Sequence, residues 1–536
     1  MEGRIGRALD HPGAGVVFRT ALLMVLAFGI EEFLMRITHL REEAFAQPVL
    51  AVALAERLAG AGIPGLLVLC GLAGLVAIAA WKRSLGPRWT DLEHGARLRL
   101  LIVAQAGVLA WMYASYDYNF YLDRSHAVDR LLLIAAVPLI AWRPVVTPVF
   151  LAALLPVIWQ FTVPIGGFSW AVPILPLRGL FLFCALGVLR TVTTRIRTTD
   201  FLFVLLCMVA ANYWASGMAK LRLDWIAIDR IGFLLPSTYA NGWLGFLSPE
   251  RIATLTGSLL SLNVPAKIVT LLIECGALLV LWRHATVRVV LLGGILLHLF
   301  IFAATGIGFW QWSLLNALVV LLFFGRIGTD LPLFTMPRFA LSLVLIGFSG
   351  LWFRPVRLAW LDARATYTYR LEATGAGGAT YALPPAFFAP YDYQFTLSAF
   401  RYLVDDKRLP ITWGATNPDV ARELNAARTA HDVLALEGRT GRNDYDAERG
   451  EDFDGFVRDF VTTWERRGGR SRLFALLQAP ATLWTFPRSE PVLKGDRIAR
   501  VTVYEVLSFF DDERYEEIRI TPVRIIETSA SPDQAR

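Results

Sequence analysis

The sequence predicts an all-α polytopic membrane helix bundle of eight to eleven spans, followed by a C-terminal α+β soluble domain. Three observations carry this prediction. First, 55% of the 536 residues are hydrophobic and only 18% are charged, whereas soluble domains carry about 25% charge. Second, the apolar residues are concentrated in runs close to the roughly 20 helical residues that cross a bilayer. Third, residues 360–536 carry 23 basic and 27 acidic side chains, a net charge of −4. Because the whole chain has a net charge of +7, residues 1–359 must carry +11.

Eleven apolar runs are candidate spans within residues 1–359. They lie near 16–38, 64–81, 99–115, 131–142, 146–165, 173–190, 201–219, 267–283, 287–303, 308–325 and 339–353. The stretch 138–176 contains seven prolines, and proline kinks or breaks a helix. Some helices in this stretch are therefore expected to be kinked or re-entrant, which sets the lower limit of eight spans.

Lysine and arginine collect in loops that eleven spans would place on one side of the membrane. These loops precede the first run and connect the second to the third, the sixth to the seventh and the eighth to the ninth. Cytoplasmic loops are enriched in these residues. The sequence therefore predicts a multi-pass protein of the cell (inner) membrane with a cytoplasmic N-terminus. The loops 116–130 and 220–266 and the domain 360–536 are then extracytoplasmic.

The first apolar run has a second interpretation, as a signal peptide with a cleavage site at Ala44–Ala46. Charged residues between that site and the apolar run favour a retained span instead; they are Glu31, Glu32, Arg36, Arg41, Glu42 and Glu43. All four cysteines lie in apolar runs. A disulfide framework in the soluble domain is thereby excluded.

The soluble domain carries strand and helix signals in turn. The alternating segments 364–372 and 379–383 flank a glycine-rich turn and predict a hairpin, and 501–510 and 515–526 predict two more strands. Asn417-Pro418 predicts the start of a helix over 419–430, and helical spacing of aromatic and valine residues predicts another over 453–464. Such a domain can bind a protein or peptide partner.

An acidic run in residues 444–454 raises the question of calcium binding. The EF-hand loop requires glycine at its sixth position and a carboxylate at its twelfth. Counted from Asp444, these positions hold Arg449 and Gly455. A solvated acidic loop is the better interpretation, and the sequence predicts no metal site.

Three ionisable residues lie at bilayer depth, where an unpaired charge costs several kcal/mol. Lys220 ends the seventh run, Glu274 lies inside the eighth and His298 inside the ninth. Each has a structural alternative. Lys220 can reach the headgroups, Glu274 can pair with Lys220 or Arg283, and His298 can be a neutral interior histidine. Because they fall on successive spans of one bundle, all three are candidate catalytic residues.

Residues 205–325 resemble the horizontally transferred transmembrane domain, a superfamily that includes the vitamin K-dependent gamma-carboxylase. The resemblance rests on an aromatic-x-small-Gly-x-x-Lys-Leu motif, then a span with Glu274, a span with His298 and a Gly/Phe-rich span. The motif residues are Trp214, Ser216, Gly217, Lys220, Leu221 and Trp225. The superfamily core would cover about 100–325, and a non-cytoplasmic soluble part after the helices is usual in the family.

This resemblance implies that Lys220 is the base that starts oxygenation of a reduced quinone, with Trp214, Gly217 and Trp225 near the cofactor. Desolvation at an apolar boundary disfavours the charged form of an amine and would suit such a base. The carboxylase has an Asn-His pair before a Tyr-Leu in an earlier segment. Here residues 117–120, directly before Tyr121-Leu122, contain no histidine, so carboxylation itself is not implied.

Three functions remain open at this point. The first is a lipid-quinone-linked membrane enzyme with an outer-face lysine base acting on an extracytoplasmic substrate. The second is a non-catalytic maturation or export factor whose C-terminal domain binds a partner. The third is a proton-coupled transporter, against which no internal repeat is evident. Nucleic-acid binding is excluded, because orienting loops explain the basic charge and the soluble domain is mildly acidic.

Overall fold

The computed structural model describes most of the chain in ranges separated by gaps. The described residues are 11, 13–62, 87–116, 120–160, 174–325, 331–389, 391–396, 403, 409, 414–415, 417–442, 444–468, 477–486 and 497–528. The predicted second apolar run, 64–81, lies outside them.

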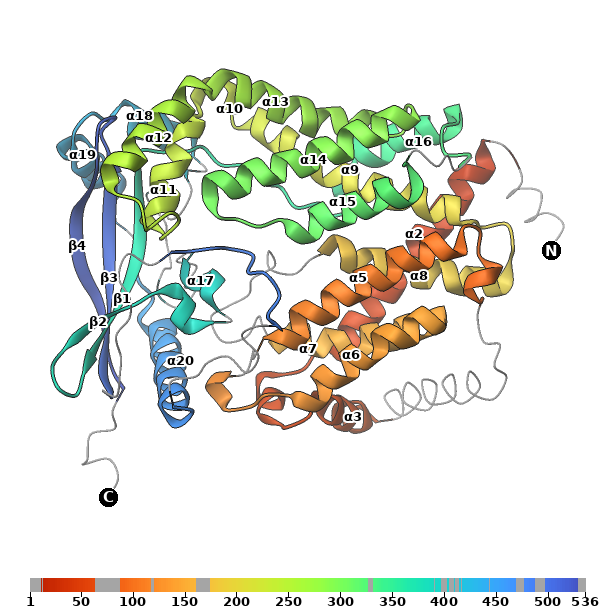
Figure 1. Ribbon diagram of the computed structural model, residues 1–536, viewed down its shortest axis with the longest axis horizontal. Helices are drawn as coiled ribbons and strands as arrows, with labels where there is room; N and C mark the ends of the chain where they lie inside the picture. The colour runs from red at the N-terminus through yellow and green to blue at the C-terminus, as the bar shows by residue number, and fades with distance from the viewer. Residues whose placement is uncertain are drawn as a thin grey trace.

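A bundle of apolar helices forms the larger part of the molecule (Figure 1). Its helices are α2 (Ala14–Thr38), α3 (Leu50–Gly60), α5 (Gly95–Ser115), α6 (Ala127–Trp142), α7 (Thr147–Gln160), α8 (Ile174–Val192), α9 (Thr198–Arg222), α13 (Asn263–Gly276), α14 (His284–Thr305), α15 (Trp310–Phe323) and α16 (Met336–Gly347). Five of them, α2, α5, α8, α9 and α14, are long and apolar enough to cross a membrane. The chain is therefore a multi-pass membrane protein, as the sequence predicts.

One further span is broken, and shorter apolar helices accompany the five. The helix α12 (Pro249–Ser261) meets the α13 segment at an angle of 64°, so the two form a bent span or a re-entrant loop. Shorter apolar helices cover Pro144–Gln160, Trp310–Phe323 and Met336–Gly347. The predicted loop 220–266 is thus largely helical, since α10 (Trp225–Ile228), α11 (Leu234–Ala240) and α12 all lie within it.

Polar contacts at the two ends of the bundle tie its helices together. At the end far from the β-sheet, which we call the basic end, Asp200 at the start of α9 pairs with Arg19 of α2 at 3.2 Å and with Arg338 of α16 at 2.8 Å. There too, Arg190 of α8 donates to the carbonyl of Asp91 before α5. The opposite end, which we call the sheet end, meets the soluble domain (Figure 1).

Helix α9 lies at the centre of the bundle, and 83% of the residues in its most apolar stretch are buried. Its neighbours are α2, α8, α13 and α16. A helix that is apolar on all sides and surrounded by others is typical of a bundle interior. Residues on α9 are consequently held in place from several directions.

The soluble domain contains a four-stranded antiparallel sheet in the order β2-β1-β3-β4. Its strands are β1 (Ala365–Gly375), β2 (Thr380–Leu383), β3 (Ile498–Phe510) and β4 (Tyr515–Glu527). The predicted hairpin and the two later strands are confirmed. The pairing of β1 with β3, from Ala365 opposite Phe509 to Gly375 opposite Ile498, joins segments far apart in the sequence.

Helices α17 (Asp392–Thr396), α18 (Pro418–Ala426), α19 (Ala430–Thr440) and α20 (Ala447–Arg466) complete the soluble domain, which confirms the α+β class. The predicted helix 419–430 is wrong at its end. It stops at Ala426, because Thr429 caps a new helix by accepting a hydrogen bond from the Asp432 amide while the Asp432 side chain bonds back to Thr429. This capping box is a helix-start signal that the sequence analysis missed.

The sheet end of the bundle and the soluble domain share apolar clusters. Phe120 and Tyr121, from the loop before α6, pack into the core between the sheet and α20. Residues 477–486 lie across the ends of the membrane helices. There Trp111 and Trp310 donate to the carbonyls of Leu477 and Pro480 at 2.8 and 3.1 Å. The soluble domain is therefore packed against the bundle at several places.

Candidate functional site

Lys220 and Glu274 form an ion pair at the sheet end of the bundle. The Lys220 Nζ lies 2.6 Å from Glu274 Oε1. Their side chains are 13% and 6% exposed, respectively. Nζ also donates to the carbonyl of Leu358 at 3.1 Å and lies 5.7 Å from the centre of the Trp225 ring. The sequence alternative that paired Glu274 with Lys220 is the one that the structure shows.

A polar stripe on α9 positions Lys220 and binds the segment around Val356 and Leu358. This segment, which we call the linker, leads into the soluble domain. Asn212, Ser216 and Lys220 are four residues apart and so share one helix face. Asn212 accepts from the Val356 amide at 3.0 Å, and Ser216 accepts from the Leu358 amide at 3.2 Å. Lys220 donates a hydrogen bond to the Leu358 carbonyl. The lysine is therefore part of the joint between the two domains as well as a buried charge.

The three predicted cofactor-side residues have different surroundings. A Cβ on Gly217 would lie 2.9 Å from Cys275 Sγ and 3.0 Å from Glu274 Cβ, so the missing side chain lets α9 and α13 approach and form the pair. Trp225 stacks near the lysine. Trp214 instead donates to the Gly347 carbonyl of α16 at 3.4 Å. Gly217 and Trp225 thus contact the Lys220–Glu274 pair, and Trp214 contacts α16.

His298 has a different set of neighbours. Its Nδ1 lies 3.3 Å from Ser313 Oγ, and its ring packs against Tyr213 and Phe309 with centroids 5.7 and 5.0 Å apart. Tyr213 accepts a 2.8 Å hydrogen bond from Asn316. These contacts are those of a neutral interior histidine in an aromatic cage. The structure brings Lys220 and Glu274 together, and it connects His298 to α9 through Tyr213.

A second charged group beside the pair escaped the sequence analysis. Asp229, in the loop after α10, accepts from the Asp362 amide at 2.7 Å. The buried Lys267 donates to the carbonyls of Ile226 and Asp229 at 2.6 and 3.1 Å. Asp229 and Asp362 are both buried. The spacing of these residues along the chain gives no signal, since Asp229 and Asp362 are 133 residues apart.

Burial raises the pKa of Asp229 to about 7, against the opposing effects of the Asp362 amide and Lys267. Burial and the neighbouring Asp229 raise the pKa of Asp362 well above its usual range. Asp229 Oδ2 has no hydrogen-bond partner among the described residues, as suits a protonated carboxyl. Burial therefore favours the protonated form of both carboxyls in the joint between linker and bundle.

These raised pKa values make the stability of the joint depend on pH. A carboxyl whose pKa is higher in the folded state contributes stability that is complete below its unfolded value, near 4, and lost as pH rises through about 7. We expect the free energy of unfolding of the detergent-solubilised protein to decrease by about 2–4 kcal/mol between pH 5 and 8. The apparent Tm should fall over the same pH range. Asp229→Asn should remove the part of this dependence that Asp229 carries and leave the part due to the buried Asp362.

The matched control is Glu56→Gln, which neutralises an exposed carboxylate on α3. It should leave the pH profile of the Tm unchanged. A profile that stays equally steep in the Asp229→Asn protein would show that other groups carry the dependence.

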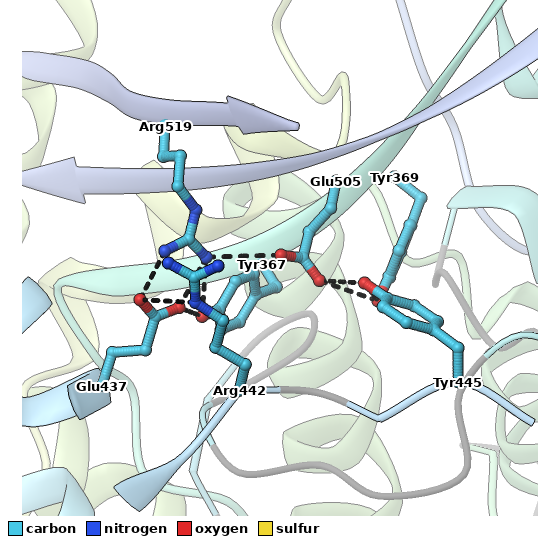
Figure 2. Close-up of polar contacts among 7 residues, drawn as sticks. All are labelled: Tyr367, Tyr369, Glu437, Arg442, Tyr445, Glu505 and Arg519. Carbon is cyan, nitrogen blue, oxygen red and sulfur yellow. Dashed lines mark hydrogen bonds and ion pairs between the residues drawn. The ribbon is translucent and has the colours of Figure 1, made fainter. Parts of the chain in front are cut away.

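A third polar cluster lies in the soluble domain, between the sheet and α19 (Figure 2). Arg519 of β4 binds both carboxylate oxygens of Glu437 and also approaches Glu505 of β3 at 3.3 Å. Tyr367 donates to Glu437, and Tyr445 donates to Glu505. Arg442 approaches Glu437 at 3.6 Å. Tyr369, which donates to Glu505, is the seventh residue of this cluster drawn in Figure 2.

The soluble cluster and the membrane pair differ in one chemical respect. Every carboxylate oxygen of Glu437 and Glu505 contacts a donor, so their hydrogen-bonding capacity is used within the protein. Glu274 Oε2, by contrast, is buried without a hydrogen-bond partner among the described residues. A buried polar atom without a partner needs an explanation, and an incoming ligand group is one. The membrane pair is therefore the better candidate site.

Comparison of the chain with protein-family models, with curated proteins and with solved structures finds no match. Within the described part of the chain, no group of three or more His, Cys, Asp or Glu residues is arranged to hold a metal ion. The assignment of a function consequently rests on the geometry of the Lys220–Glu274 site.

Proposed function

We propose that this protein is a multi-pass membrane enzyme that uses the Lys220–Glu274 pair for acid–base chemistry on a reduced, lipid-borne quinone. The observation that supports it most is the orphaned Oε2 of Glu274 beside a lysine ammonium, at the boundary between the bundle and the soluble domain. A hydroquinone hydroxyl offers a donor to that oxygen. The proposal extends the resemblance to the gamma-carboxylase superfamily noted from the sequence.

The residues around the pair fit such a ligand. Trp225 presents an aromatic ring next to the ammonium, and aromatic rings stack well on other rings. Exposed Ile268 and Leu272 lie on the face of α13 opposite Glu274 and give this helix an apolar surface toward the bilayer. A bound hydroquinone would supply an oxidisable diol that reacts with dioxygen to give an epoxide and water.

Lys220 and Glu274 would accept the proton that the hydroquinone loses. In the structure, Lys220 donates to Glu274 and to the Leu358 carbonyl, which takes two of the three N–H donors of its ammonium. For Lys220 to accept a proton from the ligand, Glu274 must first take the proton that the ammonium carries. Proton transfer within a 2.6 Å hydrogen bond requires little movement. Glu274 is thus the proton acceptor for Lys220, and Lys220 is the base that faces the ligand.

The finer topology belongs to the same proposal. At the basic end, Arg190 lies in the last turn of α8, Arg283 directly precedes α14 and Arg288 lies near the start of α14. Lysine and arginine are enriched at the cytoplasmic ends of membrane helices. We therefore place the basic end and the N-terminus in the cytoplasm and the soluble domain outside the cell (inner) membrane. Within the described part of the chain, the five long helices, the bent pair and the three shorter apolar helices make nine candidate spans, a number inside the range of eight to eleven that the sequence predicts.

The test is an oxygenation assay on the purified, detergent-solubilised full-length protein. Phylloquinol or menaquinol is added under air, and the quinone epoxide is measured by chromatography. Removal of a general base costs about 10²–10⁴ in rate, so Lys220→Met and Glu274→Gln should each lower epoxide formation at least about 100-fold. The matched control is Lys267→Met, which removes another buried lysine that binds only backbone carbonyls.

Rates are compared per folded protein, judged by a single symmetric gel-filtration peak. Lys267→Met should retain most of the rate. No epoxide from the wild-type protein with either quinol would refute the enzyme and favour the non-catalytic maturation or export factor. Full activity in Lys220→Met would refute the role of the lysine, and proton-coupled uptake into vesicles would favour the transporter.

A further inference from the structure

A groove of about 800 Å³ runs along α2 on the membrane surface of the bundle. One wall is a single face of α2 from Val17 to Arg36, and the other comes from α16 and the turn that follows it, with Leu345 and Trp352. The volume lies in the range of ligand-binding pockets, about 300–1,000 Å³. The groove shares no lining residue with the Lys220–Glu274 site.

The lining changes from apolar to charged along the groove. Val17, Met24, Val25 and Phe28 line the part of the groove toward the N-terminal end of α2. Its mouth, toward the sheet end, holds two glutamates and three arginines; they are Glu31, Glu32, Arg36, Arg178 and Arg354. An apolar channel with a charged mouth matches a molecule with a tail and a polar head.

The net charge of the residues at the mouth indicates the charge of the polar head group that can bind there. Glu31 pairs with Arg178 at 3.3 Å, and Glu32 pairs with Arg36 at 2.8 Å. Both glutamates are thereby neutralised. Arg354 is exposed, lines the mouth and has no ion-pair or hydrogen-bond partner among the described residues. The mouth therefore carries one uncompensated positive charge.

The length of the apolar part indicates what kind of tail fits. From Glu31 back to Thr20 the helix rises about 16 Å, which is roughly half of the 30 Å hydrocarbon core. Acyl chains of one leaflet have this reach. Val25 and Val344, both exposed at the groove, would contact such chains.

We propose that this groove is a binding site for an anionic glycerophospholipid of the leaflet at the sheet end, with its phosphate at Arg354 and its acyl chains along α2. The inference does not depend on the proposed enzymatic function. An anionic lipid bound here would bridge α2, α8 and the residues after α16, since Arg178 of α8 also donates to the Phe353 carbonyl.

The groove can be filled by mutation without disturbing the backbone. A Cβ on Gly29, which lines the groove, has no atom within 4 Å. Gly29→Phe should therefore occupy the space of the acyl chains, and loss of a helix-interior glycine does not destabilise the helix. The matched control is Gly187→Phe on α8, where a Cβ also meets nothing within 4 Å. Gly187 lies outside the groove lining.

The test is native mass spectrometry of the delipidated full-length protein, incubated with equimolar dioleoyl-phosphatidylglycerol and dioleoyl-phosphatidylcholine. The wild-type protein should retain phosphatidylglycerol preferentially. Arg354→Gln should weaken this preference about fivefold, as expected for one basic residue at a membrane surface. Arg251→Gln, a charge-matched exposed control on α12, should leave it unchanged.

Gly29→Phe should abolish the preference, and Gly187→Phe should retain it. Equal retention of the two lipids by the wild-type protein would overturn the proposal, as would undiminished phosphatidylglycerol binding in Gly29→Phe. Displacement of phosphatidylglycerol by equimolar undecaprenyl phosphate would overturn the choice of a glycerophospholipid as occupant.

Discussion

Arg519→Met is expected to lower the free energy of unfolding of the soluble domain by about 3–5 kcal/mol. Arg519 is the cation that binds Glu437 through two nitrogens and also contacts Glu505 (Figure 2). The two glutamate side chains are only 4% and 6% exposed. Methionine fills a similar volume but leaves two buried carboxylates facing each other, and removal of one partner from a buried ion pair is strongly destabilising.

The effect is measured by urea unfolding of the full-length protein in detergent, followed by proteolysis of the soluble domain. The control is Arg500→Met on β3, which breaks a pair with Glu527 whose side chains are 49% and 59% exposed. Such a surface pair is worth about 0–1 kcal/mol. Equal losses in the two variants would show that burial of the carboxylates does not set the cost.

Arg519→Lys separates charge from geometry in the same cluster. Lysine keeps the positive charge but lacks the planar fork that contacts two carboxylate oxygens. Burial also raises the pKa of Tyr445, whose hydroxyl donates to Glu505, so this tyrosine remains a donor at any physiological pH. Because lysine retains the charge but not the two-oxygen contact, the free energy of unfolding of Arg519→Lys is expected to lie between those of the wild type and Arg519→Met.

Local sequence signals were sufficient for the elements of the soluble domain. Alternating residues predicted β1 through β4, because strands with one buried face repeat every second residue. Asn417 and Pro418 predicted the start of α18, where Asn417 accepts hydrogen bonds from the amides of Asp419 and Val420. These signals depend on residues within a few positions of each other, and the structure confirms the elements that they predicted.

Contacts between distant segments could not be predicted in the same way. Glu437 and Arg519 are 82 residues apart and meet only because α19 packs on the sheet. Nothing in the sequence around either residue indicates that partner. The sequence did name Lys220 and Glu274, because a charge in an apolar run is conspicuous wherever its partner lies. It could not separate Lys220 from Arg283 as that partner, since only the packing of α9 on α13 decides.

The same reasoning explains His298 and Asp229. His298 was conspicuous for the same reason as Glu274, but a neutral histidine can be satisfied by a hydroxyl, and Ser313 provides one. Asp229 lies in the predicted extracytoplasmic loop 220–266, outside the predicted spans, where a carboxylate is expected to be solvated. Its burial follows from the linker that covers it through the Asp362 amide, an arrangement that exists only in the folded chain.

Lys220→Met is expected to destabilise the bundle by about 3–5 kcal/mol, because it leaves Glu274 buried without its cation. The double variant Lys220→Met/Glu274→Leu removes both charges and should recover most of this loss, since apolar residues of similar volume often replace a buried ion pair without cost. Unfolding in mixed SDS–detergent micelles, followed by tryptophan fluorescence, measures both. The single variant alone therefore cannot separate a structural role of the lysine from a chemical one.

The double variant makes that separation, because it should fold and yet form no epoxide. Gly217 allows α9 and α13 to pack equally closely in both proteins, so the geometry of the joint is retained when the charges are removed. A stable double variant that still oxygenated the quinol would eliminate the pair as the acid–base machinery. A double variant as unstable as Lys220→Met would show instead that the contact of Lys220 with the Leu358 carbonyl, rather than the pairing of charges, holds the linker on α9.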